Sequence, residues 1–76
     1  MTTIVLPELG EGIKSAIVAY WHVKAGDLVT QGDEVCEVTT DKATFNVEAP
    51  VSGKIAAINV PVGQEGQVGG VLGVIE

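Results

Sequence analysis

Few side chains in this 76-residue chain have the chemistry to catalyse, bind or become modified, and one of them occupies an unusual place. Lys42 follows Asp41 between two short runs, Val35–Thr39 and Thr44–Ala49, that have the composition of β-strands. Asp tolerates tight-turn geometry, and a lysine has no apolar reason to be buried. The spacing therefore predicts an amine at the tip of a hairpin, either a solvated lysine or a chemically modified one.

The other candidate groups do not form a catalytic set. His22 is the only histidine and lies in a predicted strand, where we expect a structural or solvated role. Cys36 is the only cysteine, and its acidic neighbours disfavour the reactive thiolate. It cannot form an internal disulfide, which suits a reducing compartment. Because no Ser/His/Asp or Cys/His group stands at a recognisable spacing, we expect neither catalytic residues nor a metal site.

The charge balance limits the partners of the chain. Four basic residues, all lysine, stand against ten acidic ones, a net charge of −6. Nothing here neutralises a run of phosphates or favours an anionic membrane surface. No apolar stretch approaches the roughly 20 residues that span a bilayer, and no secretory signal is visible at the start. The acidic residues either form a recognition face around the predicted hairpin or are ordinary solvated charges. Those in question are Asp33, Glu34, Glu37, Asp41 and Glu48.

Short β-branched runs separated by Gly, Pro, Asn and Asp predict strands and no helix. Aromatic residues make up only 4% of the chain, so a core of Val, Ile, Leu and Ala is expected, with Trp21 as an anchor. The segment Gly63–Gly70 is predicted to be rich in turns. The fold class is therefore all-β, a sandwich or flattened barrel. The predicted strands are Thr3–Leu6, Ala16–Val23, Leu28–Val29, Val35–Thr39, Thr44–Ala49, Ile55–Val60 and Val71–Ile75.

An internal repeat gives the arrangement of these strands. Residues 37 positions apart match in both turn glycines and core positions. This register predicts two similar β units packed about a quasi-two-fold axis and sharing one core. Such an axis places the hairpin of Lys42 and the chain termini at opposite poles. The matched pairs include Ser15/Ser52, Val18/Ile55, Ala19/Ala56, Trp21/Ile58, Val23/Val60, Gly26/Gly63, Gly32/Gly69, Val35/Leu72 and Val38/Ile75.

Thr40-Asp41-Lys42-Ala43 resembles the lipoylation motif of lipoyl domains, with Lys42 at the place of the modified lysine and Asp41 and Ala43 as the flanking motif. The resemblance covers essentially all 76 residues, because further family segments follow in order. They are Leu6–Ile13, Trp21–Asp27, Ala49–Ile55 and Val68–Leu72. The chain departs from the usual pattern in its closing part, at Gln64, Gly66, Gly70 and Gly73.

The resemblance implies a barrel-sandwich hybrid of two four-stranded antiparallel sheets and a carrier rather than an enzyme. Lipoic acid would be held in amide linkage on Lys42 as a swinging arm. In this family the lipoyl group is reductively acylated by a 2-oxo acid dehydrogenase (E1), passes the acyl group to coenzyme A at the acyltransferase core (E2), and is reoxidised by dihydrolipoyl dehydrogenase (E3). A lipoate ligase or lipoyl transferase attaches the group. The catalytic chemistry thus belongs to other domains.

The resemblance also places the chain in a larger assembly. Residues 1–76 are expected to be one lipoyl-carrier domain, at the N-terminus of a longer E2 chain. We expect the isolated domain to be a monomer, in the cytoplasm of a prokaryote or in the mitochondrial matrix of a eukaryote. The sequence leaves the 2-oxo acid open.

Three alternatives remain open. A biotinyl domain also modifies a hairpin lysine, but that lysine is normally flanked by methionines, whereas the only methionine here is Met1. A glycine-cleavage carrier is normally longer and has helical segments. A β interaction module with an unmodified Lys42 is the third.

The segment Glu8–Lys14, which precedes the second predicted strand, has no partner in the repeat, so folding symmetry does not require it. The family resemblance places this segment beside Lys42, where it would help E1 choose the domain. Alternatively, Leu9 and Ile13 close the end of the core. The residues proposed for partner recognition are Glu8, Leu9, Gly10, Glu11, Gly12 and Thr40.

Overall fold

The computed structural model describes residues 1–76 and consists of eight β-strands joined by turns and loops. The structure contains no helix long and apolar enough to cross a membrane. The strands are β1 (Thr2–Val5), β2 (Ser15–Trp21), β3 (Leu28–Val29), β4 (Glu34–Thr39), β5 (Thr44–Glu48), β6 (Gly53–Ile58), β7 (Glu65–Gln67) and β8 (Val71–Ile75).

Two four-stranded antiparallel sheets make up the fold, as predicted. Strands follow the order β1-β8-β6-β3 in the first sheet and β5-β4-β2-β7 in the second. Exchanging β1–β4 with β5–β8 converts one order into the other, so the quasi-two-fold symmetry predicted from the repeat is confirmed. Each sheet takes two strands from each half of the chain, and the halves are therefore interleaved.

Backbone hydrogen bonds in the turns obey the same symmetry. Gly26 N–H donates to the Ile55 carbonyl at 2.8 Å, and its counterpart Gly63 N–H donates to the Val18 carbonyl at 2.8 Å. These glycines have φ values of 97° and 91°, in the left-handed region that favours Gly. The glycines that aligned in the repeat are thus the residues that let each half turn onto a strand of the other.

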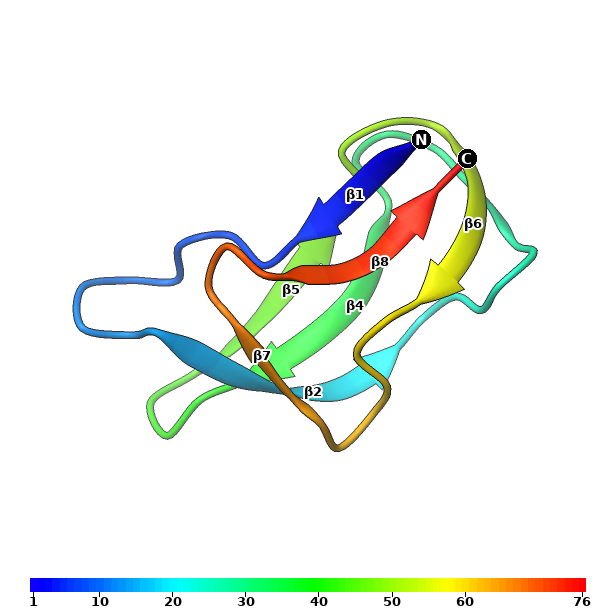
Figure 1. Cartoon of the computed structure of the whole chain (residues 1–76). Helices are drawn as coiled ribbons and strands as arrows, with labels where there is room; N and C mark the ends of the chain where they lie inside the picture. Colours follow the sequence, from blue (N-terminus) through cyan, green and yellow to red (C-terminus); the bar gives the residue numbers. More distant parts are fainter.

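Figure 1 shows the two chain ends side by side at one end of the molecule and the β4–β5 hairpin at the other. The predicted separation of the lysine hairpin from the termini is confirmed. The blue loop that joins β1 to β2 extends at the same end of the molecule as the hairpin (Figure 1).

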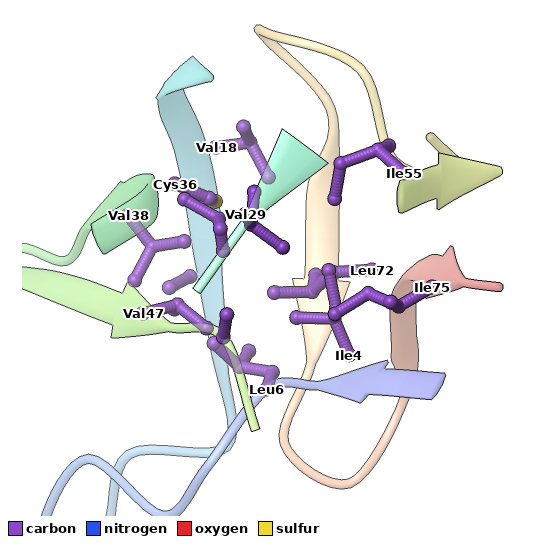
Figure 2. Close-up of a cluster of buried hydrophobic side chains, with 13 residues drawn as sticks. Ile4, Leu6, Val18, Val29, Cys36, Val38, Val47, Ile55, Leu72 and Ile75 are labelled. Atoms are coloured by element: carbon purple, nitrogen blue, oxygen red, sulfur yellow. The ribbon is translucent and has the colours of Figure 1, made fainter. Parts of the chain in front are cut away.

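Aliphatic side chains from both sheets point toward one another and fill the space between them (Figure 2). Val18, Val35 and Val38 are fully buried on the second sheet, and Ile4, Leu72 and Ile75 are buried from the first. No buried side-chain polar atom lacks a hydrogen-bond partner. The core therefore rests on the burial of aliphatic surface, at about 25 cal/mol per Å².

One strand escapes prediction. The segment predicted as turn-rich contains β7, which pairs with the start of β2 through Gly66 and Ala16. Glycine and polar residues conceal the strand, since Gly66 has no side chain to give an apolar signal. The other predicted strands are present, with ends that differ by one or two residues.

Two glycines of the closing segment provide space for larger neighbours. A Cβ on Gly73 would lie 2.9 Å from the Ala57 carbonyl oxygen and 3.3 Å from Trp21 Cη2. The indole of Trp21 packs against the core here, half-buried, and its Nε1–H donates to the Val60 carbonyl at 2.7 Å. Gly73 thus accommodates the predicted anchor.

Gly66 likewise leaves space that the side chain of Leu72 occupies. A Cβ on Gly66 would lie 2.9 Å from Leu72 Cδ2. At the equivalent positions of the first half, Val29 and Val35 are both buried. One half therefore fills this part of the core with two valines and the other with a glycine and a leucine.

This exchange predicts compensation between positions 66 and 72. Leu72→Val should destabilise the domain by about 1 kcal/mol because it leaves a cavity. Gly66→Val should destabilise it by roughly 1–3 kcal/mol through overpacking. The double variant should lose less than the sum, which a double-mutant cycle from urea unfolding midpoints would measure. Strictly additive losses would contradict the exchange.

Candidate functional site

Lys42 lies at the tip of the β4–β5 hairpin. The strands pair as far as Thr39 and Thr44, and the backbone N–H of Thr40 donates to the Ala43 carbonyl at 2.8 Å. Asp41 and Lys42 are thus the two central residues of a tight turn, as the sequence predicts. Asp41, Lys42 and Ala43 are all exposed.

The Lys42 amine is available for reaction. Its side chain is exposed and takes part in none of the side-chain hydrogen bonds of the molecule. Its backbone is held, since Lys42 N–H donates to the Thr40 hydroxyl at 3.2 Å. A fixed base with an unencumbered amine suits covalent attachment of a carboxylic acid cofactor through an amide.

A groove of about 560 Å³ runs between the hairpin and the β1–β2 connection. Its charged lining residues carry both signs, with Lys14 and Lys42 opposed to Glu11, Asp41 and Glu65. Glycine, hydroxyl and apolar groups complete it. These further residues are Gly12, Ile13, Ser15, Ala16, Ile17, Thr39 and Thr40.

The structure divides the residues proposed for partner recognition. Glu11, Gly12 and Thr40 line the groove beside Lys42, whereas Glu8, Leu9 and Gly10 do not. Leu9 is half-buried against the core, so this residue closes one end of the core.

The tip of this loop is a defined turn. Ile13 N–H donates to the Gly10 carbonyl at 3.2 Å, and Gly12 has φ of 81°. A φ of about +80° is what a type II turn requires at its third residue, and glycine supplies it without strain. The turn presents Glu11 and Gly12 to the groove.

The five acidic residues considered for a recognition face do not gather around Lys42. Glu34 and Glu48 pair at the far end of β4 and β5 from the hairpin, and Asp33 Oδ2 accepts from Thr30 N–H at 2.9 Å. Of the five acidic residues considered, only Asp41 lines the groove, so the placement of the set favours the second alternative, ordinary solvated charges. Sequence reasoning missed Glu65, which lies on β7 and lines the groove; the 37-residue register makes its position equivalent to that of Leu28 on the predicted strand β3.

His22 and Cys36 lie outside this site. His22 is exposed, and its ring meets the ring of Tyr20 edge-on with centroids 5.2 Å apart. Cys36 is buried in the core. Burial raises the pKa of its thiol to about 11, and the Glu37 carboxylate adds to the increase. No group of three His, Cys, Asp or Glu side chains gathers as a metal site.

Comparisons with known proteins agree with a carrier domain. The model of the biotin-requiring enzyme family, Biotin_lipoyl, matches residues 2–75. The solution structure of the lipoyl domain of the 2-oxoglutarate dehydrogenase complex from Azotobacter vinelandii superposes with a TM-score of 0.78 at 32% identity. That match covers 100% of this chain and 96% of the other.

Two curated relatives are acyltransferase components. The lipoamide acyltransferase component of the branched-chain alpha-keto acid dehydrogenase complex of Pseudomonas aeruginosa is 44% identical over 91% of this chain. The dihydrolipoyllysine-residue acetyltransferase component of the pyruvate dehydrogenase complex of Mycoplasma capricolum is 43% identical over 100% of it. The chain spans only 16% and 17% of the lengths of these two relatives.

The fold and its exposed hairpin lysine define a carrier domain for a covalently attached cofactor, with the catalytic part of the relatives lying elsewhere in their chains. The chain belongs to the biotin/lipoyl family and, within it, to the lipoyl domains of the dihydrolipoyl acyltransferase type.

Cys36 provides a test of the electrostatics. Its folded-state pKa is raised, so it stabilises the fold fully below the unfolded thiol pKa, and this contribution is lost as pH rises toward about 11. The urea midpoint should fall between about pH 9 and 11, and it should fall less in Cys36→Ala.

Labelling with iodoacetamide at pH 8 supplies a second readout. The buried thiol should react slowly in the folded domain and rapidly in urea. Rapid labelling of the folded domain would show that Cys36 is a reactive group after all.

Proposed function

We propose that Lys42 carries lipoic acid in amide linkage and that the domain serves as the swinging-arm carrier of the E2 acyltransferase of a 2-oxo acid dehydrogenase complex. The free amine at the hairpin tip and the similarity to acyltransferase components support this proposal. Asp41 and Ala43 flank the attachment point and leave it open to solvent.

The observation that carries the proposal is the placement of the β4–β5 hairpin, which has Lys42 at its tip, at the end of the molecule away from the termini (Figure 1). A tether at the termini leaves the lysine facing outward. Tethering raises the effective concentration of the lysine at any active site that the tether can reach.

The residues of the domain supply attachment and presentation. Lys42 Nζ forms the amide, the hairpin fixes the Cα from which the side chain extends, and the groove gives a partner a surface to contact. When bound, the lipoyl dithiolane supplies acyl and electron transfer between enzymes.

The proposed partners are the E1 dehydrogenase, the E2 catalytic core, the E3 dihydrolipoyl dehydrogenase and a lipoate ligase or lipoyl transferase. The proposed location is the prokaryotic cytoplasm or the mitochondrial matrix, where these enzymes work on 2-oxo acids. The negative charge of the domain makes a basic surface on a partner the best match.

Among Lys14, Lys24, Lys42 and Lys54, only Lys42 should accept a lipoyl group, because only Lys42 lies at the tip of a tight hairpin. Co-expression with a lipoate ligase should add the mass of one lipoyl group. Lys42→Arg should abolish the addition, and Lys54→Arg, a change at the other end of the molecule, should leave it intact.

Peptide mapping decides the site. Lipoate on Lys14, Lys24 or Lys54 would refute the assignment. Modification with biotin instead, by a biotin ligase supplied in parallel, would favour the biotinyl alternative, and an unmodified domain would favour an interaction module.

The β1–β2 connection is the proposed recognition element for E1, with Glu11 and Gly12 at the groove and Glu8, Leu9 and Gly10 supporting the loop. Glu11 is the residue to test because it is exposed and lines the groove beside Lys42. Leu9 is a poorer choice, because its removal would also open the core.

Glu11→Gln should lower the rate at which the cognate E1 acylates the lipoylated domain several-fold, because rim charges act on association. Ligase modification and the melting temperature should stay unchanged. Glu34→Gln removes one charge at the far end of the sheet and is the matched control. If the two substitutions lowered the acylation rate equally, Glu11 would act only through the net charge of the domain and not through its place beside Lys42.

A further inference from the structure

The turn that holds Lys42 lacks the positive φ angles that are usual in two-residue hairpin turns. Two-residue hairpin turns normally use positive φ, because only then does the turn twist in the same sense as the strands. No residue other than glycine has positive φ in this structure, so Asp41 and Lys42 both have negative φ. Such a turn joins twisted strands poorly through backbone bonds alone.

The Thr40 hydroxyl adds side-chain hydrogen bonds across this turn. Its Oγ1 accepts from the N–H groups of Lys42 and Ala43, each at 3.2 Å, and donates to the Ala43 carbonyl at 3.2 Å. The Ala43 N–H therefore meets a side chain rather than the Thr40 carbonyl. That carbonyl accepts from the Thr39 hydroxyl at 3.4 Å.

The hydroxyl thereby fixes the backbone on which the modified side chain stands. The bond from Lys42 N–H to Thr40 Oγ1 is the only hydrogen bond between this lysine and a side chain, and the exposed lysine side chain itself forms none. The backbone of Lys42 is thus held through Thr40, while no hydrogen bond holds Nζ.

We propose that Thr40 is a positioning residue for modification of Lys42, through this threefold contact across the turn. The inference rests on the proposed function, because it names the residue that presents Lys42 to the ligase. In the reaction, lipoate first displaces pyrophosphate from ATP to form an acyl-adenylate, and Nζ then attacks the carbonyl of that adenylate. The amide C–N bond forms as the C–O bond to AMP breaks, Nζ loses a proton, and nothing is oxidised or reduced.

A positioning role differs from a structural one in what it changes. The turn is largely exposed, and water can replace the hydroxyl as a partner of the two N–H groups. Loss of the hydroxyl should therefore leave the global fold nearly unaffected while the tip becomes mobile. Misplacing a reacting group by about 1 Å can cost on the order of 100-fold in rate.

The test compares Thr40→Val, which keeps the shape and removes the hydroxyl, with Thr40→Ser, which restores it. Thr44→Val is the matched control, since this exposed threonine of the same hairpin takes part in none of the side-chain hydrogen bonds. Purified lipoate ligase, lipoate and ATP modify each unmodified domain, and intact mass gives kcat and KM.

Thr40→Val should lower kcat/KM about tenfold or more, with Thr40→Ser and Thr44→Val near the unsubstituted domain. All four melting temperatures should agree closely. Amide exchange at Lys42 and Ala43 of the unmodified domain, followed by NMR, should accelerate in Thr40→Val alone.

Modification of Thr40→Val at the normal rate would overturn the proposal, and so would a loss in Thr40→Ser as large as that in Thr40→Val. Unchanged exchange at Lys42 and Ala43 would overturn it without reference to the ligase. Failure of the unsubstituted domain to be modified at Lys42 overturns the proposed function first and the positioning role with it.

Discussion

Exchange of strands between the two halves of the chain is the constraint on which the rest of this structure depends. β2 pairs with β7, and β6 pairs with β3, so each half contributes two strands to each sheet. Both halves supply side chains to the core from both sheets, so the core is complete only when the halves are interleaved. The core is small, as expected for a domain of this length, and consists mainly of valine, isoleucine and leucine.

The quasi-two-fold symmetry of the fold is broken in two places. The β4–β5 hairpin joins the two halves, whereas no such connection links β8 to β1 at the symmetry-related place, and the connection 6–14 is longer than its counterpart 49–52. Both departures bear on the site, because the hairpin carries Lys42 and the longer connection lines the groove beside it. Symmetric parts are explained by folding, and the asymmetric parts at the lysine end are therefore those to which the proposed presentation and recognition are assigned.

Sequence patterns predict the symmetric part well and the site only in outline. Paired glycines and β-branched runs reveal the two-fold repeat, because turns and core positions constrain residue type directly. β7 escapes, since Gly66 yields its volume to Leu72 and leaves no apolar signal. The acidic residues close to Lys42 in sequence are mostly distant in space, because strands carry them to the far end of the sheet. Glu65 arrives at the groove from β7, and only the pairing of β7 with β2 brings it there.

The role of Thr40 lies beyond sequence reasoning for a related reason. A threonine before a turn fits partner contact, strand propensity or capping equally well, and the φ angles of the next two residues decide among them. Because those angles are negative, the turn does not follow the twist of the strands. The Thr40 hydroxyl, rather than the Thr40 carbonyl, then accepts the hydrogen bond from Ala43 N–H. A swinging-arm carrier needs both a held backbone and a free side chain at the modified lysine. The partner must find the lysine Cα in one place, while the amine and the group that it carries move freely. The hydrogen bonds of the structure accordingly end at the backbone of Lys42, which the hairpin and Thr40 hold, and none reaches its exposed side chain.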